Sequence, residues 1–204
     1  MKHQRSLLFV ALAAVFFGSL LAAGPALAHH PFGGQTPTNA LEAVLSGIAH
    51  PVIGFDHFAF VVAVGLLAAI PKKGSFWIPG SFLLAALGGT LAHVAGWNLP
   101  LPELFISASV LAFGLLLAID RPFPVVLAPV LAAIAGLFHG YAYGEAIVGA
   151  EMTPLLAYLI GFTLIQTAIA AAAFAMGRFT LKGNLRPAGY ALCGIGAAFL
   201  SSAF

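Results

Sequence analysis

Charged residues are scarce in this chain. Asp, Glu, Lys and Arg make up 7% of its 204 residues, against about a quarter in a typical soluble domain, and apolar residues make up 61%. So few polar groups cannot form a water-soluble surface, and the long apolar runs predict membrane-spanning helices of about 20 residues each. The runs are continuously apolar and do not alternate with polar residues, which excludes a transmembrane β-barrel.

Other absences narrow the function. The single cysteine, Cys193, lies in the last apolar run, which excludes disulfides and cysteine-rich zinc sites. The sequence has no His-Glu-x-x-His motif of a zinc protease and no glycine-rich phosphate loop with lysine. We therefore expect no enzymatic activity, no ATP hydrolysis by this chain and no organic cofactor. The net charge of +2 gives no reason to expect a nucleic-acid partner.

The first 28 residues have the layout of a secretory signal peptide. A short basic start at residues 1–5 precedes the apolar stretch Leu7–Leu21, and the small residues Ala26–Ala28 follow the helix-breaking Pro25. We expect cleavage after Ala28, with an uncleaved first span as the alternative. Either version places residue 29 outside the cell.

The rest of the chain, residues 29–204, is predicted to be one all-α domain that crosses the membrane six times. The apolar runs occupy approximately 53–70, 76–97, 103–119, 123–143, 153–177 and 186–203. Every basic residue of the mature chain falls in the connection after the first, third or fifth run. The positive-inside rule puts these connections in the cytoplasm and the mature N-terminus outside. We expect a multi-pass protein of a bacterial inner membrane, with the lipid bilayer as its surroundings.

This orientation predicts a group of side chains at one depth near the outer surface. His50, Asp56 and His57 surround the start of the first run, while His93 and His139 lie four residues before the outer ends of the second and fourth. A charged group at the bilayer centre costs about 2.5–3.5 kcal/mol on insertion scales, so these side chains are expected to face a partner or a path.

Two carboxylates and two further histidines lie on the same side. Glu145 and Glu151 follow the fourth run, and His29-His30 would begin the mature chain, where a free amine and two imidazoles could chelate a metal at the mouth. Imidazoles and carboxylates without a thiolate suit a divalent transition ion. Ni²⁺ or Co²⁺ fits this set best, although Zn²⁺, Cu²⁺ and Fe²⁺ could use the same atoms.

The reach of Glu145 depends on the local backbone. It follows His139 by six residues, about 240° around an ideal helix, so it can approach the same ion only if Gly144 ends the helix and turns the chain back. Glu151 needs a longer return through Gly149.

Each histidine in a helix also has a purely structural interpretation. His93 could be a hydrogen-bonding group near Thr90, and His139 could pair with Tyr143 one turn later. Two other functions remain open: a cytochrome with haem between His93 and His139, and a metal-binding accessory protein that does not transport.

The sequence gives little support for two inverted triplets of helices, since no histidine starts the fourth run. Glycines predict close helix packing, at Gly88, Gly89, Gly136, Gly140, Gly144, Gly189, Gly194 and Gly196.

Two motifs resemble those of a known family. His50-x5-Asp56-His57 and Phe138-His139-Gly140-x-Ala142 look like the two signatures of the HupE/UreJ family of hydrogenase and urease accessory membrane proteins. The resemblance extends over nearly the whole mature chain. The family pattern usually has a second His and a Glu where this chain has Tyr143 and Ala146.

The resemblance implies a function that composition does not show. Members of this family are regarded as nickel or cobalt permeases, so the expected cargo is Ni²⁺ or Co²⁺. We expect His50, Asp56 and His57 to form the outer site and His139 with a nearby carboxylate to complete it. A second copy of this chain and a metallochaperone are the protein partners left open.

Overall fold

The computed structural model of the protein describes residues 35–119 and 126–203. The expected signal peptide and the His29-His30 pair lie outside the described residues, and both stay predictions. Within the described residues every regular element is helical. The elements are α2 (Ala40–Ile53), α3 (Phe55–Ala68), α4 (Trp77–Val94), α5 (Pro102–Ala118), α6 (Leu127–Gly144), the 3₁₀ turn η2 (Glu145–Ile147), α7 (Met152–Ala175), the π-helical turn η3 (Met176–Thr180) and α8 (Arg186–Ser202).

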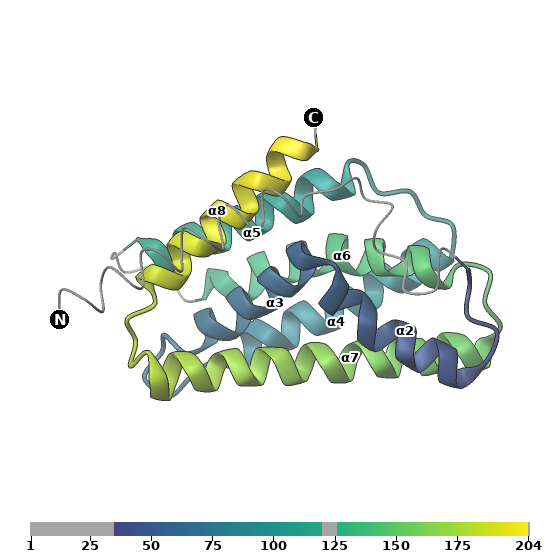
Figure 1. The fold of residues 1–204 in the computed structure, drawn as a ribbon, viewed down its shortest axis with the longest axis horizontal. Coiled ribbons are helices and arrows are strands. Elements are labelled where there is room, and N and C mark those ends of the chain that lie inside the picture. The colour runs from purple at the N-terminus through teal and green to yellow at the C-terminus, as the bar shows by residue number, and fades with distance from the viewer. Residues whose placement is uncertain (1–34, 120–125, 204) are drawn as a thin grey trace.

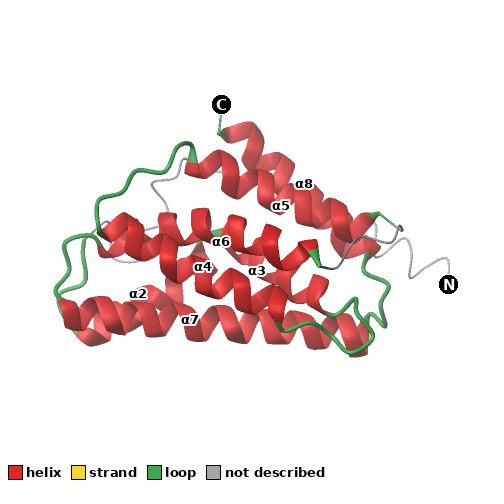
Figure 2. Cartoon of the chain, turned by 180° about the vertical axis from the view of Figure 1, so that it is seen from behind, coloured by secondary structure: helices red, strands yellow, loops and turns green. Residues whose placement is uncertain are grey.

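Helices α3 to α8 correspond to the six apolar runs predicted from the sequence, with ends that differ by a few residues, and the loops gather at the two ends of the bundle (Figure 2). Three of them are long and apolar enough to cross a membrane alone: α4, α6 extended by η2, and α7 extended by η3. The pair α2 and α3 makes a fourth candidate if it is counted as one bent span. Helices α5 and α8 have 17 residues each, which is short of about 20.

The first predicted span, 53–70, needs a correction. Helix α3 covers only 14 residues, about 21 Å, which is less than a hydrocarbon core of about 30 Å. A further helix, α2, precedes it, and the two are bent by 79°. Pro51 lacks the N–H that would continue the helical ladder, and Gly54 takes an extended conformation, with φ −68° and ψ 94°. The apolar run therefore begins with a broken helix.

The two ends of the bundle carry opposite charge. Lys72, Lys73, Arg178, Lys182 and Arg186 lie where α3 ends, α7 ends and α8 begins, and we name this the basic end. Glu42, Glu103, Glu145 and Glu151 lie at the acidic end, where α2, α5 and α7 begin (Figure 1). The basic end is the one that the positive-inside rule assigns to the cytoplasm.

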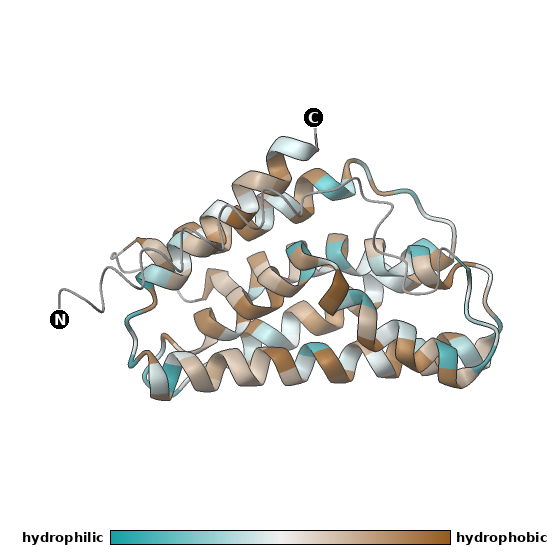
Figure 3. Ribbon diagram, viewed as in Figure 1, coloured by the Kyte–Doolittle hydropathy of each residue, from teal (hydrophilic) through white to brown (hydrophobic). Residues whose placement is uncertain are grey.

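The outward faces of the helices are apolar. On α7, Leu156, Ile160 and Leu164 follow each other at one-turn spacing and are all exposed. The opposite face of the same helix buries Tyr158 and Gln166. Figure 3 shows apolar residues along the outsides of the long helices. This polarity is inverted relative to a water-soluble bundle and is that of a membrane protein.

Glycines allow the closest helix pairs, which are α4 with α6, α2 with α7 and α5 with α8. A Cβ atom at Gly140 would overlap the carbonyl oxygen of Ala86, and one at Gly89 would overlap that of Leu137. Gly47 and Gly161 lie equally close to the facing backbone in the second pair, as do Gly114 and Gly189 in the third. Small residues thus set the helix separation, as predicted for Gly89, Gly136, Gly140, Gly144, Gly189 and Gly196, whereas a Cβ atom at Gly88 would meet nothing.

The pairing pattern has an internal symmetry. The first three units, α2/α3, α4 and α5, can be matched in order with α6, α7 and α8. Under this match the pair of α4 with α6 becomes the pair of α7 with α2/α3, and the pair of α5 with α8 maps onto itself. Because successive helices run in opposite directions, this is the pattern that an inverted repeat of three helices gives. The pairing therefore supports an arrangement for which the sequence alone gave little support, and the histidines do not follow it.

Candidate functional site

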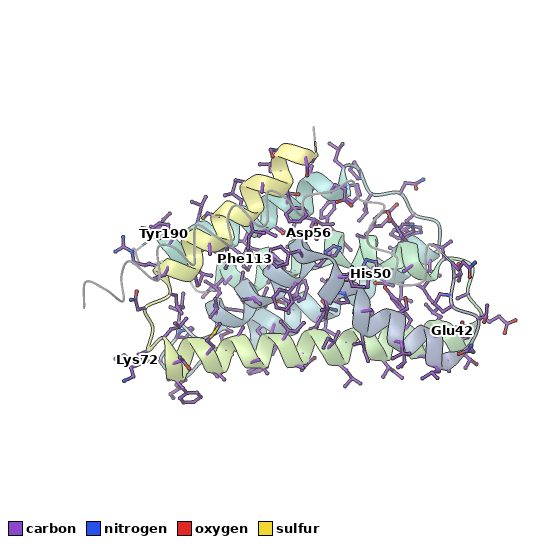
Figure 4. The ribbon with its side chains drawn as sticks, in the orientation of Figure 1. Glu42, His50, Asp56, Lys72, Phe113 and Tyr190 are labelled. Atoms are coloured by element: carbon purple, nitrogen blue, oxygen red, sulfur yellow. The ribbon has the colours of Figure 1, made fainter. Side chains whose placement is uncertain are left out.

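Three histidines and one aspartate converge at the break between α2 and α3. His50 lies in the last turn of α2, Asp56 and His57 lie in the first turn of α3, and His139 lies on α6. All four are at most 3% exposed. Figure 4 shows His50 and Asp56 close to this junction, between Glu42 at one end and Lys72 at the other. The structure thus brings together the residues of both sequence motifs.

The break places two helix ends against each other. Gly54 donates its N–H to the carbonyl of His50 at 3.0 Å and accepts from the N–H of Phe58 at 2.8 Å. Asp56 therefore lies at the N-terminal end of α3, where unpaired N–H groups favour a negative charge. Its Oδ1 accepts the backbone N–H of His57 at 2.8 Å. A helix end of this kind is a suitable position for a buried carboxylate.

A chain of hydrogen bonds fixes the tautomers of His139 and His57. The Ser109 hydroxyl donates to the carbonyl of Ile106 at 2.6 Å, so Nε2–H of His139 donates to Oγ of Ser109, at 3.0 Å. Nδ1 of His139 is then an acceptor, and it lies 2.8 Å from Nδ1 of His57. His57 is therefore the donor and carries its lone pair on Nε2.

A second chain fixes His50. The Tyr158 hydroxyl donates its hydrogen to the carbonyl of Tyr143 at 2.8 Å, so it accepts from Nδ1–H of His50 at 3.1 Å. His50 then also carries its lone pair on Nε2. Partners of this kind on the far ring nitrogen are what orient metal-binding histidines in proteins.

The two imidazoles that carry Nε2 lone pairs are close together. The ring centres of His50 and His57 lie 5.7 Å apart. Two imidazoles that bind one ion through nitrogens about 2.1 Å from it have ring centres about 4.5–6 Å apart. The spacing of His50 and His57 therefore suits a shared ion, while His139 is occupied in holding His57.

Tyr143 completes the inner side of this cluster. Its ring centre lies 5.1 Å from that of His50 and 4.7 Å from that of His57. Its hydroxyl is one of two buried side-chain atoms without a hydrogen-bond partner within residues 35–119 and 126–203. An oxygen donor thus lies beside the two imidazoles, where the family pattern usually has a second histidine.

The cluster is not preassembled around an ion. In the part of the chain that the structure describes, no group of three or more His, Cys, Asp or Glu side chains has the arrangement of a metal site. One oxygen of the Asp56 carboxylate, Oδ1, accepts the N–H of its own neighbour, His57. A carboxylate has two oxygens, so this contact is compatible with an ion at Oδ2.

An aromatic wall closes the basic side of His139. The ring of Phe60 stacks on His139 at 4.4 Å and packs against Phe82 at 5.3 Å and Phe113 at 4.7 Å. These three phenylalanines come from α3, α4 and α5, and all are buried. The direct line from the cluster toward the basic end is therefore shut in this conformation.

His93 lies apart from the cluster. It is half-buried near the end of α4, where its Nδ1 lies 2.7 Å from the carbonyl of Tyr141 and its ring stacks on that side chain at 4.1 Å. Thr90 instead links Ala86 and Gly140 through its hydroxyl. His93 thus joins α4 to α6 through a partner other than Thr90.

Glu145 and Glu151 are exposed at the acidic end. Gly144 keeps helical angles, with φ −60° and ψ −29°, and the chain continues directly into η2. The turn that Glu145 needs in order to reach His139 is therefore absent at Gly144. Glu151 is the residue before the first turn of α7.

Sequence reasoning gave no role to Ser109 and Tyr158. A lone serine in an apolar helix carries no metal signal, and a tyrosine in such a helix is common. Only the pairing of α5 with α6 and of α2 with α7 gives these hydroxyls their partners.

Comparisons with known proteins agree with the motifs. The chain matches the family described as HupE / UreJ protein over residues 7–201. It is similar to Protein HupE of Rhizobium leguminosarum bv. viciae, with 30% identity over 181 residues that cover 86% of this chain and 91% of the relative. No solved structure matches. Since the family match covers nearly the whole chain, the protein belongs to the HupE/UreJ family.

Proposed function

We propose that the protein is a permease for a divalent transition-metal ion, Ni²⁺ or Co²⁺, which binds at His50, Asp56 and His57 and is released at the basic end. The observation that carries the proposal is the pair of buried imidazoles, His50 and His57, whose ring centres lie 5.7 Å apart beside a buried carboxylate at a helix break. Two nitrogen donors and one anionic oxygen suit Ni²⁺ and Co²⁺. The family is one of transporters and accessory proteins and not a class of enzymes.

In this proposal His139 positions a ligand. Both of its ring nitrogens are used, one by Ser109 and one by His57. It therefore orients His57, as partners of metal-binding histidines do elsewhere. The same two contacts argue against a haem between His93 and His139, because an axial ligand needs a lone pair directed at the iron.

Transport requires the helix break to move. Asp56 lies in the first turn of α3, and the break at Gly54 lets that turn shift without disturbing α2. Broken helices at a binding site are the common device of secondary transporters. The wall of Phe60, Phe82 and Phe113 closes the direct line from the cluster to the basic end.

The proposed setting is the inner membrane of a bacterium. The separation of basic and acidic ends supports a cytoplasmic basic end and an outer mature N-terminus. Six crossings would need α5 and α8 to span with 17 residues each, which local thinning of the bilayer permits.

Uptake into proteoliposomes tests the proposal. Vesicles that contain the purified full chain are expected to accumulate radiolabelled Ni²⁺ or Co²⁺ saturably, each ion competing with the other, while vesicles without protein do not. Zn²⁺, Cu²⁺ and Fe²⁺ serve as further competitors. Binding of the ions without any accumulation would indicate a metal-binding accessory protein instead.

A further inference from the structure

We infer that Gln166 forms an inner station on the route of the ion, between the histidine cluster and the basic end. The inference rests on the proposed function, because it concerns where a bound ion goes next. No sequence motif marks this residue, and it lies on α7, outside both family signatures.

Gln166 has an unusual side chain for its surroundings. It is fully buried, and its Nε2 donates to the carbonyl of Phe162 at 3.1 Å. Its Oε1 is the other buried side-chain atom, besides the Tyr143 hydroxyl, that lacks a hydrogen-bond partner among the described residues. Leaving a buried acceptor without a partner destabilises the fold, so an amide retained there calls for an explanation.

The position of Gln166 continues the cluster inward. Tyr158, Phe162 and Gln166 occupy the same face of α7 at one-turn spacing, which puts Gln166 about 12 Å from Tyr158 along the helix. The Phe162 ring lies between them, with its centre 5.6 Å from that of Tyr143 and 5.8 Å from that of Tyr158. Phe162 thus joins the aromatic rings of the cluster to the turn of α7 that carries Gln166.

A cavity lies farther toward the basic end, lined by residues that follow Gln166 on α7 but not by Gln166 itself. It measures about 460 Å³ and is lined on α7 by Thr167, Ala170 and Ala171, the residues that follow Gln166 toward the basic end. Lys73 and Ser75 line its other side, next to the α3–α4 connection. At about 30 Å³ for each water molecule, this volume has room for a hydrated ion.

The chemistry of an amide suits transfer better than storage. A neutral amide oxygen replaces one hydration water of the ion but binds it more weakly than the imidazoles and carboxylate of the outer site. Conduction needs sites that an ion can leave. Because Phe60, Phe82 and Phe113 close the line through α3, α4 and α5, the route along α7 is the one that offers an oxygen donor and then a cavity.

The test compares binding with transport in the purified full chain. Gln166→Leu and Gln166→Met each remove the amide oxygen while keeping a side chain of similar size. We expect both variants to bind Ni²⁺ within about twofold of the parent by calorimetry, because the outer site is unchanged, and to lose uptake into proteoliposomes at least tenfold. Gln166→Glu, which keeps an oxygen at the same place, is expected to retain uptake.

Thr163→Val is the matched control. Thr163 lies one turn away on the same helix, and its hydroxyl donates to the carbonyl of Leu159 within that helix, so its loss is expected to leave binding and uptake unchanged. Uptake at the parental rate in Gln166→Leu would overturn the inference. So would the failure of both Leu and Met variants to accumulate as folded protein, since the amide would then serve folding. If the parent itself transports neither ion, the proposed function fails instead.

Discussion

His57 and His139 are 82 positions apart in the sequence, yet their Nδ1 atoms lie 2.8 Å apart in the core of the bundle. This contact joins the two family motifs into one site and gives the two residues unequal roles. His57 donates the shared hydrogen and keeps its Nε2 lone pair, whereas His139 accepts it and is held in turn by Ser109. One motif supplies ligands and the other orients them.

Ser109 is therefore expected to affect metal binding without touching the ion. Ser109→Ala removes the acceptor of Nε2–H of His139, which loosens His57 through the shared hydrogen bond. Loss of such an outer partner costs about 10–100-fold in affinity at other metal sites, and we expect about tenfold here for Ni²⁺, measured by calorimetry.

Ser107→Ala is the control for this prediction. Ser107 is buried on the same helix, but its hydroxyl donates to the carbonyl of Glu103 within α5. Equal affinities of the two variants would show that the chain from Ser109 to His57 does not orient the ligand.

Two adjacent glycines on α4 are expected to differ in their effect on stability. Gly89 faces α6, where an added Cβ would overlap the carbonyl of Leu137, whereas Gly88 is exposed and an added Cβ would meet nothing. Gly89→Ala is expected to lower the free energy of unfolding by about 1–3 kcal/mol through overpacking. Gly88→Ala is expected to leave it unchanged or raise it by up to about 1 kcal/mol through helix propensity. Unfolding in detergent, followed by circular dichroism, measures both; a Gly89→Ala variant as stable as the parent would contradict the close packing of α4 on α6.

The acidic loop is expected to contribute little to the site. Glu145→Gln and Glu151→Gln remove charges that are exposed at the acidic end, away from the turn that would bring Glu145 back to His139. We expect both variants to take up Ni²⁺ within about twofold of the parent at low concentration, since solvent and salt screen the interactions of exposed charges. A strong loss in Glu145→Gln would mean that the loop folds back onto the cluster during transport.

The sequence predicted the helices well because the apolar runs are long and are separated by Pro, Gly and charge. It also predicted that His50, Asp56, His57 and His139 lie together, since a common depth in the membrane restricts where such residues can be. It placed the start of the first span too late, because Pro51 inside a helix reads as a helix boundary. The helix in fact continues through Pro51 and breaks at Gly54.

Finer features depend on side-chain partners that only tertiary packing creates. The alternative interpretation of His139 paired it with Tyr143 on the same helix. In the structure Tyr143 packs against His50 and His57, and His139 contacts Ser109. Spacing along one helix cannot decide between a partner on that helix and one on a neighbour. The same limit hides Gln166, whose unpartnered oxygen is visible only when the burial of α7 is known.

The most direct measurement of the central claim compares two neutralised acids in the same uptake assay. Asp56→Asn keeps the shape of the side chain and removes the anionic ligand beside His57, while Glu145→Gln removes an exposed charge at the acidic end. At matched amounts of inserted protein, uptake of radiolabelled Ni²⁺ and Co²⁺ by Asp56→Asn is expected to fall at least about tenfold, as for the loss of a metal ligand, and Glu145→Gln is expected to match the parent. Parental uptake by Asp56→Asn would contradict the assignment of the metal site to the break between α2 and α3.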